Sequence, residues 1–210
     1  MTEIILVRHG ETEWNRREIF RGRSDIELSE AGARQAELLA KYLSQVEIAA
    51  IYASPLKRAL KTAEAIAGYH KLEVKTDTGL IDLDYGKWQG RPCKQVEERY
   101  RKLYAEWLKN PHRVKMPGGE SLNDVRRRAL GVVHRVTEQD TGTVVLVSHR
   151  VVNKVLICAL LGLDNSHLWN VRQDISAITT FTYDNDRFSL TRHNDNSFLE
   201  ALPTAPLSDF

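Results

Sequence analysis

Three short apolar segments, each ending in polar or basic residues and followed by a helical pattern, constrain the fold of this chain most. They span residues 4–7, 48–53 and 143–147. Apolar runs of four to six residues without polar alternation are typical of strands buried on both faces, as in a parallel sheet. Because helical patterns separate these strands, we expect a single α/β domain with a mostly parallel central sheet and helices on both faces.

Capping residues mark where the predicted helices begin. Ser29 precedes apolar residues at three-to-four spacing and is expected to cap a helix. Ser54, followed by Pro55, predicts a second helix with proline at its first position. Ser121 and Asp124 have the spacing of a capping box ahead of a third, amphipathic helix. Helices are therefore expected to alternate with strands along most of the chain.

The remaining pattern predicts one more helix and a late hairpin. The helix is expected over residues 96–108, before a Pro-Gly-Gly turn. Residues 177–183 and 188–192 flank an Asp-Asn-Asp-Arg turn and predict an antiparallel hairpin. The last residues contain two prolines and little pattern. We therefore divide the chain into one domain over residues 1–200 and a loose C-terminal tail over residues 201–210.

The composition is that of an ordinary globular protein. The chain has 210 residues, and its 30 basic and 28 acidic residues give a net charge of +2, so no nucleic-acid partner is expected. The one basic run, residues 126–128, lies in a helical pattern and is interpreted as a solvated helix face. The sequence shows neither a signal-peptide pattern nor an apolar stretch of about 20 residues. We therefore expect a cytoplasmic location and no membrane contact.

Polar and basic residues follow all three apolar strands. His9 follows the first, Arg58 lies in the helix after the second, and His149 follows the third. The carboxyl ends of parallel strands meet at one edge of the sheet, where α/β folds bind their ligands. We therefore expect these three side chains and the neighbouring Arg8 to gather at one site.

This set of side chains suits a phosphoryl group. Arginine offers planar, bidentate donors to phosphate oxygens, so Arg8 and Arg58, with a protonated His149, are expected to bind a tetrahedral dianion. A neutral imidazole on His9 keeps a lone pair on one ring nitrogen and can attack phosphorus in line. One histidine at a strand end is more often structural than catalytic, but three strand ends that carry His or Arg favour phosphoryl transfer.

Transfer through histidine also needs a carboxyl group that protonates the leaving alkoxide and then activates water. Asp82 and Asp84 are the candidates, although Asp84 could equally be a loop residue bonded to its own backbone. No metal or other cofactor is expected, because the chain has no HExxH, Cys/His-cluster or P-loop motif. Cys93 and Cys158 lack metal-ligand spacing and are interpreted as free thiols.

Several ordered motifs resemble the phosphoglycerate mutase-like branch of the histidine phosphatase superfamily. They include Leu-Val-Arg-His-Gly-Glu-Thr at residues 6–12, Ser-Pro-Leu-Lys-Arg-Ala at 54–59, Asp-Tyr-Gly-Lys-Trp-Gln-Gly at 84–90, Pro-Gly-Gly-Glu-Ser at 117–121 and Val-Ser-His at 147–149. In size and motif the chain is similar to α-ribazole phosphatases and metal-independent phosphoserine phosphatases. The resemblance implies that residues 1–200 are a histidine phosphatase catalytic domain.

The resemblance also implies a role for each matching position. His9 would carry a phosphohistidine. The phosphoryl group would be bound by Arg8, Asn15, Arg58 and His149. The acid/base of the family is usually a Glu two residues before an Asp-aromatic-Gly step, and Asp82 occupies that position with a side chain one methylene shorter. Asp82 is therefore the predicted acid/base, with Asp84 as the alternative.

Two positions depart from the family pattern by adding a cation. Arg21 stands where a Phe-Gln-Gly step commonly has Gln, and Arg150 stands after the second His, where a small residue is common. Both are expected at the mouth of the pocket, although a surface salt bridge is the alternative role for each. Together they favour a substrate with a second anionic group, such as phosphoserine or phosphoglycerate, over α-ribazole phosphate.

The resemblance implies a metal-independent phosphatase that acts on a small phosphorylated metabolite. A cofactor-dependent phosphoglycerate mutase uses the same chemistry, but such mutases carry an Arg-His-Tyr-Gly segment where this chain has Asp84-Tyr85-Gly86. A phosphate-binding domain that has lost catalysis is the third alternative. The one feature that favours it is the aspartate at position 82, where the family usually has Glu. The sequence identifies neither the substrate nor the oligomeric state, so a homodimer stays open.

Overall fold

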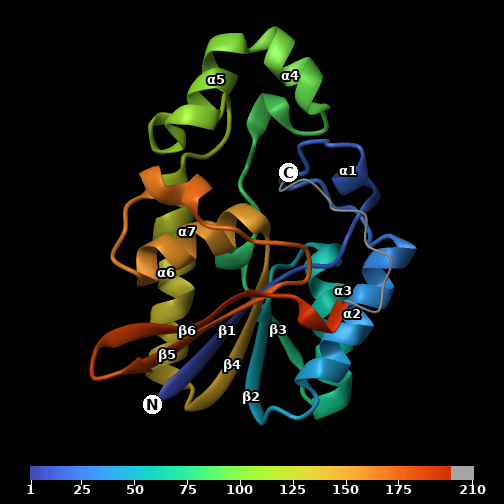
Figure 1. The fold of residues 1–210 in the computed structure, drawn as a ribbon, viewed down its shortest axis with the longest axis vertical. Coiled ribbons are helices and arrows are strands. Elements are labelled where there is room, and N and C mark those ends of the chain that lie inside the picture. Colours follow the sequence, from blue (N-terminus) through green and yellow to red (C-terminus); the bar gives the residue numbers. More distant parts are fainter. Residues whose placement is uncertain (200–210) are drawn as a thin grey trace.

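A six-stranded mixed sheet forms the centre of the protein, with helices on both faces (Figure 1). The computed structural model describes residues 1–199. In spatial order the strands are β3 (Val74–Thr76), β2 (Ile48–Ala53), β4 (Gly142–Ser148), β1 (Thr2–Arg8), β5 (Ile178–Asp184) and β6 (Arg187–Asp195). The first four run parallel, and β5 pairs antiparallel with both β1 and β6. The predicted fold class is thus confirmed; the predicted tail at 201–210 lies outside the described residues.

The main helices begin close to where the capping residues predict. They are α1 (Glu13–Arg16), α2 (Glu30–Leu43), α3 (Lys57–His70), α4 (Cys93–Arg99), α5 (Arg101–Lys109), α6 (Leu122–Gln139) and α7 (Arg150–Leu160). The Ser29 side chain caps α2 and Ser121 caps α6, as predicted. The helix predicted over 96–108 is instead two helices, which meet at Tyr100 in a non-helical conformation. Ser54 does not cap α3, which begins at Lys57 after the N-cap Leu56.

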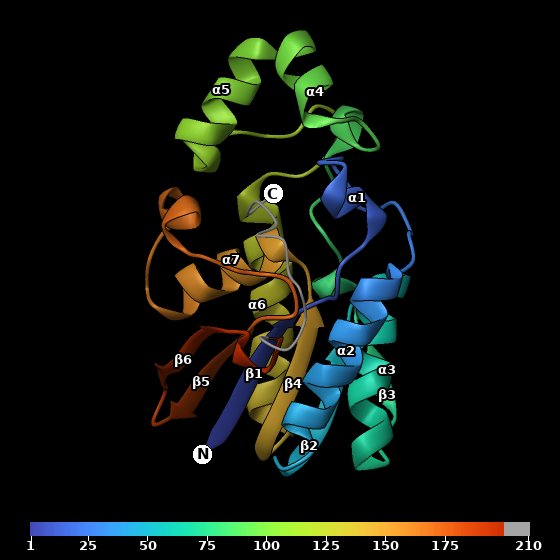
Figure 2. The same cartoon turned by 45° about the vertical axis from the view of Figure 1, so that its right-hand side comes forward.

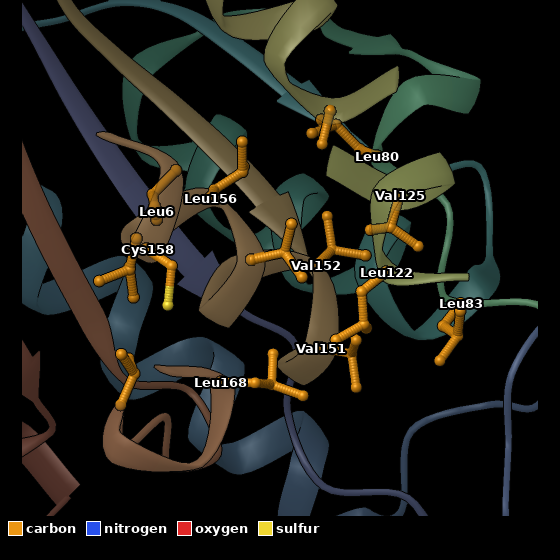
Figure 3. Close-up of a cluster of buried hydrophobic side chains, with 14 of the residues drawn as sticks. Leu6, Leu80, Leu83, Leu122, Val125, Val151, Val152, Leu156, Cys158 and Leu168 are labelled. Carbon is orange, nitrogen blue, oxygen red and sulfur yellow. The ribbon is translucent and has the colours of Figure 1, made fainter. Parts of the chain in front are cut away.

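Alternate residues of each central strand belong to different cores. In β1, Ile4 and Leu6 belong to a cluster with apolar residues of α6 and α7, whereas Ile5 and Val7 belong to a cluster with residues of α2 and α3. Figure 3 shows Leu6 beside Leu156 and Cys158 of α7, and Leu122 and Val125 of α6 on the other side of the same cluster. Side chains of a strand alternate between the two faces, so an apolar run without polar interruption fills both cores.

Helices α4 and α5 form a cap beyond the carboxyl ends of the parallel strands. Figures 1 and 2 show this pair at the end of the molecule opposite the N-terminus, with α1 close to the same end. The chain segments that follow β1 and β4 therefore run toward the cap. Within residues 1–199, no helix has both the length and the apolar character that a membrane span requires.

Candidate active site

Four predicted residues meet at the carboxyl edge of the sheet. Nε of Arg58 lies 3.3 Å from Nε2 of His9, and Nη2 of Arg58 lies 3.1 Å from Oδ2 of Asp82. The rings of His9 and His149 are edge to face, with centroids 5.2 Å apart. All four side chains are buried, although they come from segments far apart in the sequence. The gathering predicted from the strand ends is therefore present.

The ring of His9 has its lone pair on Nε2. Its Nδ1 lies 2.6 Å from the carbonyl oxygen of Gly10, which can only accept, so Nδ1 carries the proton. Nε2 accepts from the guanidinium of Arg58. Burial, and then the charges of Arg58 and Arg8, lower the pKa of His9 well below 6.5. The imidazole is therefore neutral near pH 7, which is the form that can act as a nucleophile.

Arg58 is fixed by backbone carbonyls of the loop before α2. Its Nη1 donates to the carbonyl of Ser24 at 2.8 Å, and its Nη2 donates to that of Gly22 at 2.7 Å. Gly22 adopts a φ of +50°, and a Cβ there would clash with the side chain of Gln89. A glycine at this position thus lets the loop carbonyls reach the guanidinium and hold it against His9.

Arg8 and Asn15 are the two further side chains that the sequence analysis expects to bind the phosphoryl group. Nη1 of Arg8 donates to the carbonyl of Gln173, which fixes the buried guanidinium at the end of β1. Oδ1 of Asn15 accepts from the backbone and the hydroxyl of Thr12, so the amide orientation is set. Nδ2 of Asn15 is buried and has no hydrogen-bond partner among residues 1–199. A buried amide without a partner is costly, and a phosphate oxygen would satisfy it.

His149 is held by a serine that sequence reasoning assigned to a helix cap. Its Nε2 lies 2.7 Å from Oγ of Ser54, and its Nδ1 lies 3.8 Å from Oδ2 of Asp82. Burial, and then the charge of Arg58, lower the pKa of His149 well below 6.5. This shift favours the neutral imidazole, whereas the sequence analysis expects a protonated ring. Nδ1 has no hydrogen-bond partner in the described part of the chain, which leaves it available to a ligand.

The two candidate carboxylates have different surroundings. Oδ2 of Asp82 faces Arg58 and His149. Oδ1 of Asp82 accepts a hydrogen bond from the backbone N–H of Leu83. Asp84 instead accepts from the backbone N–H of Gly86 at 2.8 Å, as in an Asx turn. The geometry therefore favours Asp82 as the carboxylate that meets the reacting group.

Arg128 positions the Asp82 loop, a role that sequence reasoning missed. Its guanidinium donates to the carbonyls of Gly79, Ile81 and Asp82 and forms an ion pair with Glu120. The interpretation of residues 126–128 as one solvated face is therefore wrong for Arg128, whose side chain is only 18% exposed. The sequence signal that could have predicted its burial is its helical spacing from the buried residues of α6.

Glu11 connects the loop after β1 to the start of α2. It is buried, and its Oε1 accepts from the hydroxyl of Ser29 at 2.7 Å and pairs with Arg16 at 2.8 Å. Its backbone N–H donates to the side chain of Gln35 in α2. Glu11 thus fastens the loop after β1 to the start of α2 and supports the position of His9.

Arg21 and Arg150 lie inside the protein rather than at the mouth of a pocket. They are 7% and 6% exposed, so the expected position is corrected. Burial, and then the charge of Arg150, lower the pKa of Arg21 to about 10. The guanidinium of Arg150 lies 5.6 Å from the ring centroid of Trp169, in cation–π contact. The positive charge of Arg150 therefore acts on Arg21 inside the protein.

The donor set at this edge consists of imidazoles, guanidiniums and an amide. Within the described residues, no three His, Cys, Asp or Glu side chains are grouped so that they could hold a metal ion. Such donors suit an anion with several oxygens, such as a phosphoryl group. The chain belongs to the histidine phosphatase superfamily, branch 1, whose family model matches residues 4–196.

Known relatives match nearly the whole chain. Phosphoserine phosphatase 1 of Hydrogenobacter thermophilus is 38% identical over 207 residues, which cover 96% of this chain and 98% of the relative. The structure of YhfR from Bacillus stearothermophilus has a TM-score of 0.91 at 33% identity, covering 95% and 100% of the two chains. A mycobacterial glucosyl-3-phosphoglycerate phosphatase has a TM-score of 0.85 at 29% identity, covering 91% and 98%. The chain is accordingly a phosphomonoesterase.

Proposed function

We propose that the protein hydrolyses a small phosphomonoester through a phosphohistidine on His9, with Asp82 as general acid and base. The observation that carries this proposal is the contact of Arg58 with both groups, at 3.3 Å from His9 and 3.1 Å from Asp82. One guanidinium thus places a nucleophilic nitrogen and a carboxylate next to the same phosphoryl site. The relatives named as phosphatases support the same reaction class.

The first step would transfer the phosphoryl group to the enzyme. Nε2 of His9 attacks phosphorus with its lone pair, the N–P bond forms, and the P–O bond to the leaving alcohol breaks. Asp82 gives its proton to the departing alkoxide oxygen. The phosphoryl oxygens would be held by Arg8, Asn15, Arg58 and His149. Fixed donors of this kind stabilise the transition state without rearranging during the reaction.

The second step would return the site to its starting state. The carboxylate of Asp82 takes a proton from a water molecule, the water oxygen attacks phosphorus, and the N–P bond breaks. The electron pair returns to Nε2 of His9, and phosphate leaves. One carboxyl group serves both steps because its protonation state alternates between them.

Relatives narrow the substrates to be tested. The names of two relatives mention phosphoserine and glucosyl-3-phosphoglycerate, which both carry a carboxylate. The candidates are therefore phosphoserine, phosphoglycerate and, as an ester without a carboxylate, α-ribazole phosphate. Turnover should be measured over this panel together with p-nitrophenyl phosphate, which reports phosphatase chemistry without specific recognition. If the protein hydrolyses none of these esters, the proposed function is contradicted.

Activity is expected to persist in excess EDTA. Arg8, Arg58 and the amide of Asn15 offer the positive charge and donors that a divalent cation supplies in other phosphoryl-transfer sites. The rate of p-nitrophenyl phosphate hydrolysis should therefore be the same after dialysis against chelator as before it. Loss of the rate on chelation, with recovery on adding a divalent cation, would contradict this prediction.

The buried imidazoles predict a loss of stability in acid. Folding lowers the pKa of His9 and of His149, so below about pH 6.5 the unfolded chain binds protons that the folded protein does not. The contribution of the two neutral histidines to stability is complete above pH 6.5. As the pH drops from there toward their lowered pKa values in the folded protein, the free energy of unfolding falls. The slope is at most about 1.4 kcal/mol per pH unit for each histidine.

Urea unfolding between pH 7.5 and pH 5 measures this effect. The variant His149→Gln should lose less stability over this range than the native protein, because glutamine does not titrate. His134→Gln, at an exposed position of α6, is the matched control and should keep the native slope. Equal slopes for all three proteins would show that His149 does not change its pKa on folding.

A further inference from the structure

The turn of residues 173–177 lies against the end of β1 and contacts Arg8 twice. The carbonyl of Gln173 accepts from Nη1 of Arg8. The carbonyl of Ala177 accepts from the backbone N–H of Arg8 at 3.3 Å. Gln173, Ala177 and Arg8 are all buried. The turn therefore helps to fix both the backbone and the guanidinium of a residue that the proposed function places on the phosphoryl group.

The turn also contacts the proposed nucleophile and is closed by its own hydrogen bonds. The backbone N–H of Ser176 donates to the carbonyl of His9 at 3.4 Å. The N–H of Ala177 donates to the carbonyl of Asp174 at 3.2 Å, and Nε2 of Gln173 donates to the carbonyl of Ala177 at 3.2 Å. Ser176 has a φ of +57°, a conformation that a non-glycine residue keeps only where its surroundings hold it. Contacts from outside the turn are therefore needed to keep its shape.

Asn194, near the end of β6, supplies two such contacts. Its Oδ1 accepts from the backbone N–H of Asp174 at 2.7 Å, and its Nδ2 donates to Oδ2 of Asp174 at 2.8 Å. The pairing of β5 with β6 shifts register between Ile178 and Thr180, opposite Asn194, and irregularities of this kind re-aim a side chain. The N–H of Asn194 donates to the hydroxyl of Thr179 at 3.1 Å, which holds its backbone in the left-handed region at a φ of +51°. The amide is therefore directed at the turn.

We propose that Asn194 and Asp174 are positioning residues that act through Arg8. Their two hydrogen bonds hold the turn, and the turn holds the guanidinium that binds the phosphoryl oxygens. The inference rests on the proposed phosphatase function and adds to it a role for the β5–β6 hairpin. A donor that is already in place binds a phosphoryl group without rearranging during the reaction, so a turn that is free to shift weakens phosphate binding.

Replacing Asn194 by glycine removes the amide and keeps the left-handed backbone conformation. We expect KM for p-nitrophenyl phosphate and the calorimetric Kd for inorganic phosphate to rise about tenfold, because a hydrogen bond to a charged group becomes misaligned. The value of kcat should change less than KM, since Arg8 contacts the phosphoryl group in the ground state as well as in the transition state. Asn185→Gly is the matched control and should keep the native values. Asn185 is an exposed asparagine of the same hairpin, has a φ of +48° and bonds a neighbouring aspartate.

A double-mutant cycle tests whether Asn194 acts through Arg8. In an Arg8→Gln background, Asn194→Gly should cause no further loss, because the group that the turn positions is already gone. Exchanging the pair gives a second test, which also serves if Asn194→Gly does not fold. Asn194→Asp alone places two carboxylates together and should weaken phosphate binding, whereas adding Asp174→Asn restores a donor and an acceptor and should recover most of the native affinity. The ratio of alkyl to aryl phosphate turnover should stay native wherever Arg8 is intact, since Asp82 has other hydrogen-bond partners.

The outcomes separate this proposal from the phosphatase function. Unchanged KM and phosphate Kd in Asn194→Gly, with p-nitrophenyl phosphate still hydrolysed, would overturn the positioning role and leave the phosphatase in place. Equal losses from Asn194→Gly in the native and the Arg8→Gln backgrounds would show that Asn194 does not act through Arg8, which also overturns the proposal. Absence of hydrolysis of every ester by the native protein, p-nitrophenyl phosphate included, would instead contradict the proposed function.

Discussion

Replacing His9 by alanine is expected to lower kcat by at least about 10⁴-fold while the protein stays folded. The reason is the fixed ring: Gly10 holds Nδ1, and Arg58 faces the lone pair on Nε2. No described side chain at this edge duplicates that arrangement, since Nε2 of His149 is engaged with Ser54. Rates with p-nitrophenyl phosphate and the thermal unfolding midpoint measure activity and folding separately. The exposed His134→Ala variant should keep the native rate.

Trapping the intermediate gives an independent test of the same residue. Native enzyme mixed with substrate and quenched within milliseconds should carry a phosphoryl group that is stable in base and labile in acid, as expected for phosphohistidine. The label should be absent from His9→Ala. A phosphoryl group found on a serine or an aspartate would show that another residue is the nucleophile.

Replacing Asp82 by asparagine is expected to cost about 10²–10⁴-fold in kcat with alkyl phosphates, whose leaving groups need a proton. The loss should shrink with p-nitrophenyl phosphate, because its leaving group departs without protonation. This dependence follows from the position of Oδ2, which lies next to Arg58 and 3.8 Å from His149. The ratio of the two rates for each variant is the measurement.

Two further variants sharpen this test. Asp82→Glu keeps the carboxyl group and restores the length usual in the family, so it should retain much more activity than Asp82→Asn. Asp84→Asn should affect both substrates equally, because Asp84 is engaged with the backbone of Gly86. A loss from Asp84→Asn that depends on the leaving group, or equal losses for both substrates in Asp82→Asn, would assign the acid/base role to another residue.

The local sequence determined the sheet and the place of the site. Residues 4–7 and 143–147 fill two cores because consecutive strand side chains face opposite sides. Strands with this pattern run parallel, so their ends meet at one edge and bring His9 near His149. The short edge strand β3 was missed, because its three residues are half-buried or exposed and carry little apolar pattern.

Only the tertiary structure decided how the side chains at that edge are arranged. The Asp82 loop is positioned by Arg128, 46 residues later, and His149 is held by Ser54, 95 residues earlier. Sequence periodicity reports which face of an element is apolar, but it carries no information about which distant donor a polar group meets. The burial of Arg21 and Arg150, and the neutral state of His149, depend on such distant packing. The sequence determined which residues gather, whereas long-range packing determined their orientation and their charge.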